Sequence, residues 1–327
     1  MLRAFLIAAS LWAMLAHGGA RAEIVPAIVY AVGQKFDKSF NEAAYAGSQA
    51  FKSETGIAVL EFEPRAAAQF EQGIAALVRR GATDIVAVGF YYATPLAGLA
   101  PRFPKLRFTL IDAVAKQPNV QSIVFKEHEG AYLAGMLAAM VSKTGTVGFI
   151  GAMDIPLIRK FAVGYGEGVQ AGKPDTRLIL NYIGNTPAAF SDPTAGGELA
   201  SSQFDRGADV IFAGAGASNF GVFQKAVDRG RLAIGVDANQ NGLHPGTILT
   251  SQLKRVDLAV KRAFAGARDG SWRAGVIELG LEQDGVALAF DDNNAALVTA
   301  EMRQRLDGAR RDIIAGRIKV TDATKQP

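Results

Sequence analysis

Short apolar runs rich in Val and Ile alternate along this chain with longer segments in which apolar residues recur every three to four positions. The short runs predict buried strands, and the periodic segments predict amphipathic helices. Strands are predicted at 24–32, 57–62, 84–88, 107–111, 122–125, 146–150, 177–182, 210–213, 233–236, 247–251 and 275–279. The predicted helices include 40–52, 67–79, 129–142, 155–169, 217–229 and 256–268. This alternation is typical of parallel sheets covered by helices on both faces.

So many strands would exceed the width at which a single open sheet usually stays intact, so two sheets are expected. The chain's 327 residues also correspond to about two domains. Hydrophobic residues make up 49% of the chain and charged residues 20%, which is enough to bury large cores and excludes a disordered protein. We therefore predict an α/β protein with two Rossmann-like lobes.

The first predicted helix carries a start signal next to the end of the first strand. Ser39 and Glu42 have the spacing of a capping box, with Asp37 just before it. The ligand crevice of open α/β sheets lies at the carboxyl ends of the strands. Phe40 and Asn41 are therefore expected beside a binding site.

The first residues predict a secretory signal. A short basic start (1–3) precedes an apolar run (4–16), and Ala20, Arg21 and Ala22 fit a small-x-small cleavage site before Glu23. A membrane anchor is the alternative, but this run is shorter than the roughly 20 apolar residues that a spanning helix needs. We expect cleavage between Ala22 and Glu23 and a soluble periplasmic protein.

Charge and cysteine content exclude several classes of function. The 35 basic and 31 acidic residues leave a net charge of +4 that is spread along the chain, so no nucleic-acid site is predicted. The chain has no cysteine, which excludes disulfides, thiolate catalysis, cysteine-bound metals and a lipid-modified cysteine.

Motifs for catalysis or cofactor binding are weak. The segment 214–219 (GAGASN) follows a predicted strand and resembles a dinucleotide fingerprint, with Asp237 downstream, but Asn219 stands at the third glycine position. The simpler interpretation is that Gly214 and its neighbours allow a tight turn. A Gly-x-Ser-x-Gly elbow is absent.

Metal sites and acid–base pairs are equally poorly supported. His128 and His244 are isolated in sequence, and the carboxylate pair Glu127 and Glu129 has only its charge to suggest catalysis. We therefore predict a protein that is not an enzyme and that carries no cofactor and no metal.

Aromatic, polar and charged residues recur at predicted strand ends. They are Phe40, Asn41, Asp112, Phe220, Asp237 and Lys254. Each has a structural alternative, since such a Phe can belong to the core and such an Asp can cap a helix. Together they predict a small ligand with a flat ring, which aromatic faces stack, and hydroxyl or N–H groups, which carboxylates accept.

Several segments resemble the basic membrane protein (BMP) family, whose members are substrate-binding proteins of ABC importers and are similar to purine nucleoside receptors. These segments are DKSFN at 37–41, FKEHEGAYLAG at 125–135, VGFIGAMDIP at 147–156 and ILTSQLKRVD at 248–257. The resemblance implies a type I periplasmic-binding-protein fold with a three-strand hinge. It implies one lobe from residues 23–126 and 247–277 and the other from 127–246 and 278–327.

The resemblance also implies a nucleoside, with a purine base, in the cleft between the lobes. The implied contacts are Phe40 and Phe220 as two rings around the base, Gly214 in the turn before Phe220, Asp112 at the base edge, Asp237 and Lys254 at the ribose, and Asn41 as a further polar contact. The implied protein is a monomer that closes on its ligand and delivers it to an ABC permease.

Two departures from the family pattern bear on these expectations. The lipidation cysteine that is common in the family is missing, and Lys35 and Phe36 stand where acidic residues are common before Asp37. The second departure leaves a free nucleobase or a flavin as alternative ligands. A sensory receptor that presents its ligand, and a secreted nucleoside-processing enzyme, are alternative functions.

Overall fold

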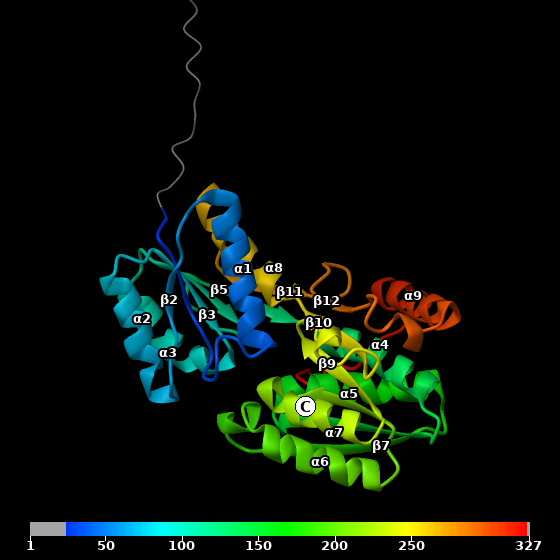
Figure 1. Cartoon of the computed structure of the whole chain (residues 1–327). Helices are drawn as coiled ribbons and strands as arrows, with labels where there is room; N and C mark the ends of the chain where they lie inside the picture. Colours follow the sequence, from blue (N-terminus) through cyan, green and yellow to red (C-terminus); the bar gives the residue numbers. More distant parts are fainter. Residues whose placement is uncertain (1–23, 326–327) are drawn as a thin grey trace, which may run out of the picture.

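The computed structural model describes residues 24–325, which form two lobes, each built on a six-stranded sheet (Figure 1). The predicted signal and its cleavage site at Ala22 lie outside the described residues. The expectation of two mainly parallel sheets in an α/β fold is confirmed.

The first lobe has the strand order β11-β5-β4-β3-β1-β2, and all neighbouring strands are parallel. Its strands are β1 (Pro26–Val29), β2 (Leu60–Phe62), β3 (Asp84–Val88), β4 (Arg107–Ile111), β5 (Val120–Phe125) and β11 (Gly275–Leu279). Its helices are α1 (Phe40–Thr55), α2 (Phe70–Arg79), α3 (Ala93–Leu99) and α8 (Val256–Asp269).

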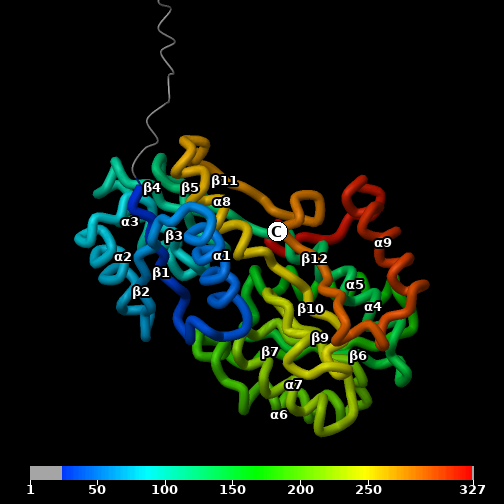
Figure 2. Tube along the Cα trace, turned by 45° about the horizontal axis from the view of Figure 1, so that its top comes forward, coloured from blue at the N-terminus to red at the C-terminus, as the bar shows by residue number. Residues whose placement is uncertain are grey.

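Alternation along the strands divides the core of this lobe between two faces. Ile28 packs into one hydrophobic cluster with Phe51 of α1 and Phe264 of α8. Ala27 and Val29 point the other way, into a second cluster with residues of α2 and α3. Helices α1 and α8 lie side by side, although they are far apart in the sequence (Figures 1 and 2).

The second lobe repeats this plan with the order β12-β10-β9-β8-β6-β7, in which only the pairing of β10 with β12 is antiparallel. Its strands are β6 (Thr146–Met153), β7 (Arg177–Gly184), β8 (Val210–Gly214), β9 (Leu232–Asp237), β10 (Ile248–Lys254) and β12 (Val286–Leu288). Its helices are α4 (Glu127–Val141), α5 (Pro156–Gly172), α6 (Pro193–Asp205), α7 (Asn219–Asp228) and α9 (Ala300–Ile314).

The chain passes between the lobes after β5, after β10 and after β11. These crossings lie next to one another, because Lys126 N donates to Leu279 O at 3.0 Å and Arg255 N donates to Gly285 O at 2.9 Å. Hydrogen bonds between the crossings tie them into one hinge region.

One predicted boundary needs correction. The sequence-based division assigned residues 247–277 to the first lobe, but β10 pairs with β9 and β12 in the second sheet. Helix α8 and β11 do belong to the first lobe. The crossing therefore falls after Lys254, because β10 completes the second sheet before the chain returns to α1.

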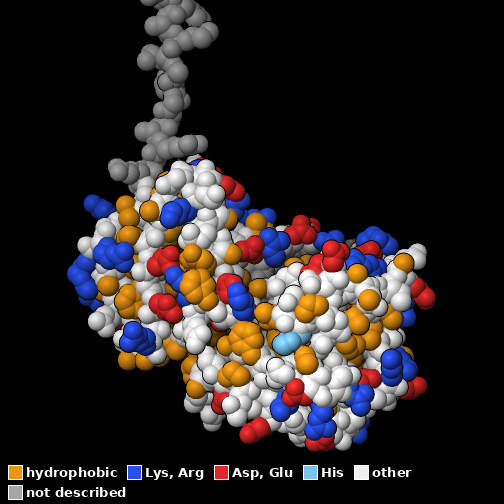
Figure 3. Space-filling model, in the orientation of Figure 1, with side chains coloured by type: hydrophobic (Ala, Val, Ile, Leu, Met, Phe, Trp, Pro, Cys, Tyr) orange, Lys and Arg blue, Asp and Glu red, His pale blue; other side chains and the backbone are white. Residues whose placement is uncertain are grey.

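The surface agrees with the diffuse charge of the sequence. On the face shown in Figure 3, basic and acidic side chains are interspersed over both lobes. Among residues 24–325, no helix is long and apolar enough to cross a membrane.

Candidate ligand-binding site

A cavity lies between the lobes and is lined by residues from both of them. About 760 Å³ of it is free of protein atoms, part of which is open to solvent. Its wall combines aromatic and aliphatic side chains with a few polar groups, which is the usual composition of a small-molecule site. Phe40, Phe90 and Tyr91 belong to the first lobe, and Leu157 and Phe190 belong to the second.

The carboxyl ends of the strands place two aspartates on opposite walls of this cavity. Asp112 follows β4, and Asp237 ends β9, which has the same place in the strand order of the second sheet. Both have left-handed backbones, with φ of 73° for Asp112 and 65° for Asp237. This conformation is uncommon outside glycine, although Asp tolerates it better than most residues, and it clusters at functional sites.

The start of α1 forms another part of the wall. Asp37, rather than Ser39, caps this helix: its carboxylate accepts from the backbone N–H groups of Ser39 at 2.8 Å, Asn41 at 3.1 Å and Glu42 at 3.1 Å. The predicted capping box is therefore wrong, since the Ser39 side chain makes no cap bond.

The hydroxyl of Ser39 reaches the opposite lobe instead. Ser39 Oγ donates to Asp237 Oδ2 at 2.5 Å. Nearby, Gln240 Nε2 donates to the carbonyl of Lys38 at 2.9 Å. These hydrogen bonds join the lobes across the cleft, as expected of a closed arrangement.

Lys254 supplies a buried ammonium group at the cleft. Its side chain is 2% exposed, and its Nζ lies 2.6 Å from Asp112 Oδ2 and 3.0 Å from Glu127 Oε1. The same atom is 5.2 Å from the centroid of the Phe40 ring. Within the described residues, Asp112 Oδ1 is buried and has no hydrogen-bond partner. One oxygen of this carboxylate is thus held by a cation and the other is left to accept a hydrogen bond.

Burial controls the protonation of this site. Desolvation raises the pKa of Asp112 to about 6 and that of Asp237 to about 6, while the charge of Lys254 opposes the shift in both. Desolvation likewise raises the pKa of Asp37 to about 6, against its three backbone hydrogen bonds. Burial alone would lower the pKa of Lys254, but Asp112, Glu127 and Asp237 outweigh it and raise the pKa, so the ammonium stays charged.

Metal binding finds no support at this site. Among residues 24–325, no group of three or more His, Asp or Glu side chains is arranged to hold a metal ion. The polar groups of the cleft are carboxylates, one amine and hydroxyls, which suit hydrogen bonding to an organic ligand.

Comparison with known proteins decides the family. Residues 24–324 match the model of the Bmp family, described as ABC transporter substrate-binding protein PnrA-like. The chain belongs to the Bmp family. The resemblance noted in the sequence is therefore confirmed, and the family is one of ABC transporter substrate-binding proteins.

Relatives within and near the Bmp family agree with this assignment. The chain is 29% identical to the ABC transporter nucleoside-binding protein BmpA of Lactococcus lactis, with 93% of this chain and 90% of the relative covered. It is 34% identical to an uncharacterized lipoprotein of Pyrococcus horikoshii, over 86% of this chain and 74% of the relative. An ABC transporter solute-binding protein of Aeropyrum pernix has the same fold, with a TM-score of 0.82 and 30% identity over 91% of this chain and 93% of that chain.

Most of the residues predicted from the sequence meet in this Bmp-family cleft. Those that line the cavity are Phe40, Asn41, Asp112, Gly214, Asp237 and Lys254. Asn41 lines it with its polar atoms already engaged, since its amide accepts from Ala31 N and donates to the carbonyls of Ala31 and Gln34. Asn41 therefore shapes the loop between β1 and α1.

Phe220 does not line the cavity. It is the second residue of α7 and is half-buried outside the cleft wall. Phe190, at the end of the short helix Pro187–Phe190, faces the cavity from the second lobe instead. The Phe190 carbonyl lies so close to Gly216 that a Cβ there would come within 3.0 Å of it, and φ of Gly216 is +59°. The glycine-rich turn thus makes room for the Phe190 segment.

Sequence reasoning also missed other wall residues. Phe90 and Tyr91 lie just beyond the end of β3, after Gly89, so the rule that identified Asp112 would have found them. Leu157, Ile158 and Phe161 come from α5, where they are indistinguishable in sequence from ordinary core positions.

Proposed function

We propose that this chain is the substrate-binding component of an ABC importer and that it binds a nucleoside, with a purine base, in the cleft between its lobes. The observation that carries this proposal is that one cavity combines a carboxylate oxygen of Asp112 that has no hydrogen-bond partner with aromatic side chains from both lobes. The name of the Lactococcus lactis relative supports the same ligand class.

In this proposal the base lies between Phe40 of the first lobe and Phe190 of the second. Both rings line the cavity and both are only partly buried, so they have surface to offer. Phe190 replaces Phe220 in this role, because Phe220 lies outside the wall. Aromatic stacking accepts any base, so specificity must come from polar contacts.

The proposed polar contacts use the hydrogen-bonding atoms of the site that the protein leaves able to accept. Asp112 Oδ1 accepts an N–H group at the edge of the base, and Lys254 holds the carboxylate in place through Oδ2. Asp237 accepts a ribose hydroxyl beside its bond to Ser39. Because the two aspartates belong to different lobes, one ligand contacts both, which favours the closed form.

Closure then couples binding to transport. The closed protein presents both lobes together to a membrane permease, and no bond of the ligand is broken. We also propose that the chain acts as a monomer outside the cytoplasmic membrane after residues 1–22 are removed. It has no cysteine for lipid attachment, whereas the Pyrococcus horikoshii relative is called a lipoprotein.

Calorimetry with the mature protein tests the ligand class. Inosine, hypoxanthine and riboflavin are titrated separately, and inosine is expected to bind at least about ten-fold more tightly than its free base, since buried polar groups left unpaired are costly. Tighter binding of riboflavin or hypoxanthine would overturn the nucleoside assignment and leave the family assignment intact.

A further inference from the structure

A chain of alternating charges leads from the cleft to the hinge. Asp112 pairs with Lys254, Lys254 pairs with Glu127, and Glu127 Oε2 pairs with Lys160 Nζ at 2.6 Å. The Glu127 side chain is 0% exposed and that of Lys160 is 7% exposed. Of these four residues, Asp112 and Lys254 line the cavity, and Glu127 and Lys160 lie behind its wall.

We infer that Lys160 is a positioning residue for ligand binding: it neutralises Glu127 and fixes the hinge segment, so that the Lys254 ammonium remains with Asp112 at the cleft. This inference rests on the proposed function, in which Asp112 and Lys254 contact the ligand.

The buried charges behind the cleft must be balanced. A buried carboxylate needs a compensating cation, because desolvating an unpaired charge is costly. Lys254 and Lys160 supply one cation for each of Asp112 and Glu127. Asp237 also acts on Lys254 but is held by the Ser39 hydroxyl and not by an ion pair. Without Lys160, Lys254 alone would face both Asp112 and Glu127. Glu127 would then attract the ammonium away from Asp112, and the cleft would gain net negative charge.

The second contact of Lys160 is the carbonyl of Phe125, to which its ammonium group donates a hydrogen bond. Phe125 ends β5, and Glu127 begins α4, so the two lie on either side of the point where the chain leaves the first lobe. One ammonium group therefore holds both the backbone and the side chain of this crossing.

The helix that carries Lys160 is itself held firmly. Helix α5 packs closely against α4, and a Cβ on Gly164 would come within 2.3 Å of the His128 carbonyl. Gly164 is one helical turn after Lys160, so the backbones of the two helices are in contact next to the ion pair. This close packing gives Lys160 a fixed position from which to direct Glu127.

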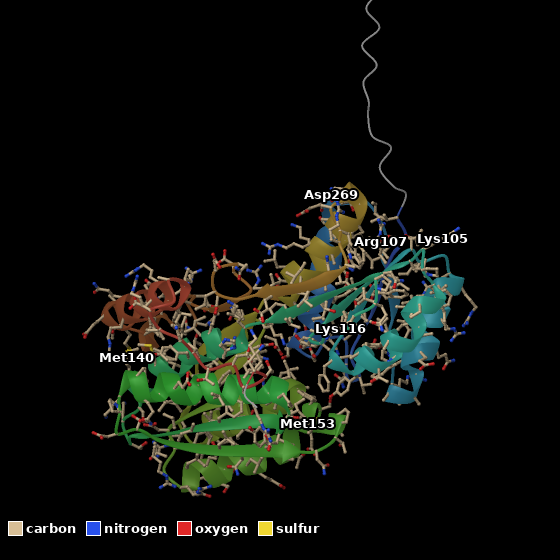
Figure 4. The ribbon with its side chains drawn as sticks, turned by 180° about the vertical axis from the view of Figure 1, so that it is seen from behind. Lys105, Arg107, Lys116, Met140, Met153 and Asp269 are labelled. Atoms are coloured by element: carbon tan, nitrogen blue, oxygen red, sulfur yellow. The ribbon has the colours of Figure 1, made fainter. Side chains whose placement is uncertain are left out.

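A purely structural ion pair would stabilise the fold without affecting the ligand. Arg107 and Asp84 form such a pair at the amino ends of β3 and β4, the ends opposite the cleft. Figure 4 shows Arg107 on the outer part of the first lobe, beside Lys105. Arg107→Met is therefore the control for the loss of an ion-paired cation away from the cleft, at a side chain that is 28% exposed against 7% for Lys160.

The experiment compares inosine binding by wild type, Lys160→Met, Glu127→Gln, the double variant and Arg107→Met. Lys160→Met is expected to weaken binding by at least about ten-fold, because it leaves Glu127 uncompensated. The double variant restores the balance of one cation to one carboxylate and is expected to bind within about three-fold of wild type. Arg107→Met is expected to lower the melting temperature and leave affinity unchanged.

Two outcomes would overturn the inference. In one, Lys160→Met binds inosine as wild type does and only melts earlier; in the other, the double variant binds no better than Lys160→Met. If Lys160→Met does not fold, the double variant decides. Binding within about three-fold of wild type supports the inference, and binding at least about ten-fold weaker than wild type would overturn it, since the double variant keeps one cation for one carboxylate.

A second readout needs no ligand and separates this inference from the proposed function. The ¹⁵N signal of the Lys254 ammonium, assigned with Lys254→Met, is expected to move in Lys160→Met and to stay in place in Arg107→Met. An unmoved signal would reject the positioning role even if wild type bound no nucleoside. Failure of wild type to bind nucleosides, with a moved signal, would reject only the nucleoside assignment.

Discussion

The two lobes present the same residue in the same backbone conformation at equivalent strand ends, yet with different partners. Asp112 is held by the charged Lys254, and one of its oxygens has no hydrogen-bond partner among the described residues. Asp237 is held by the neutral hydroxyl of Ser39 from the opposite lobe. The fold thus fixes where the carboxylates stand, while their neighbours decide what each one does.

The two aspartates are therefore expected to have different roles in ligand binding. The Asp112–Lys254 pair belongs to a buried charge chain that extends to the hinge, so its geometry is held by several ion pairs. Both pairs join the two lobes, since Lys254 ends β10 of the second sheet, but the Ser39–Asp237 contact is one hydrogen bond from a neutral hydroxyl. We expect changes at Asp112 to affect affinity more strongly than changes at Asp237.

Asp112→Asn should have the largest effect. Asn tolerates the left-handed backbone at this position, so the substitution removes charge with little strain. It leaves Lys254 without its partner at the cleft, and we expect nucleoside binding to weaken by about a hundred-fold. Calorimetry with a folded variant measures this, and an unchanged dissociation constant would remove Asp112 from the site.

The aromatic rings should come next. Phe40→Ala and Phe190→Ala are each expected to weaken nucleoside binding by about five-fold to a hundred-fold, since stacking contributes about 1–3 kcal/mol per base. Phe220→Ala is the control and should leave affinity unchanged. A loss with Phe220→Ala and none with Phe190→Ala would restore the sandwich predicted from the sequence.

Raising the pH should lower the stability of the free protein and strengthen nucleoside binding. The pKa of about 6 for Asp112 and Asp237 is above the ordinary value near 4, so the folded protein holds protons that the unfolded chain has lost. Their contribution to stability is full below about pH 4 and is lost as the pH rises through about 6.

Nucleoside affinity should rise over the same pH range, because the ionised carboxylates accept the ligand's N–H and O–H groups. Each proton released on binding contributes up to about ten-fold per pH unit below 6. Calorimetry between pH 5 and pH 8, with melting curves of the free protein, checks both signs. Affinity that falls as the pH rises would mean that the carboxyl groups bind the ligand in their protonated form.

Asp237 should have a smaller effect on affinity than Asp112 and the clearest effect on ligand preference. Asp237→Gly removes the side chain while permitting the positive φ. It should weaken inosine binding by about ten-fold and hypoxanthine binding by only a few-fold, because both ligands lose the Ser39 bond between the lobes and only inosine loses a ribose contact. Equal losses for both ligands would assign Asp237 to closure rather than to ribose.

Ser39→Ala separates these two roles of Asp237. Since the Ser39 side chain makes no cap bond, its loss reports the contact between lobes alone. We expect a weakening of only a few-fold, equal for inosine and hypoxanthine. A loss confined to inosine would show that Ser39 orients Asp237 toward the ribose.

Much of this comparison could be predicted from sequence, because strand patterns are local. The runs 84–88, 107–111 and 275–279 are strands with the predicted bounds, and the residue after 107–111 is the cleft aspartate Asp112. The same rule located Asp237. Parallel strands end at one edge of their sheet, so the pattern of strand ends is enough to locate the cleft.

What could not be predicted depends on contacts between distant segments. The Ser39 spacing fits a capping box, but the choice between the helix and a carboxylate of the other lobe is decided by closure. The run 248–254 has the same pattern in either sheet, so its place had to come from pairing with β9. Phe190 ends the short helix Pro187–Phe190, which lies too far beyond the end of β7 for the strand-end rule to indicate it. In sequence, Lys160 is simply one lysine in an amphipathic helix.

Native mass spectrometry of the mature protein in an equimolar mixture of inosine, hypoxanthine and riboflavin tests the central claim most directly. The account predicts a one-to-one complex whose added mass is that of inosine, and its loss in Asp112→Asn. A complex with riboflavin or hypoxanthine in preference to inosine, or no complex with any of the three, would contradict it.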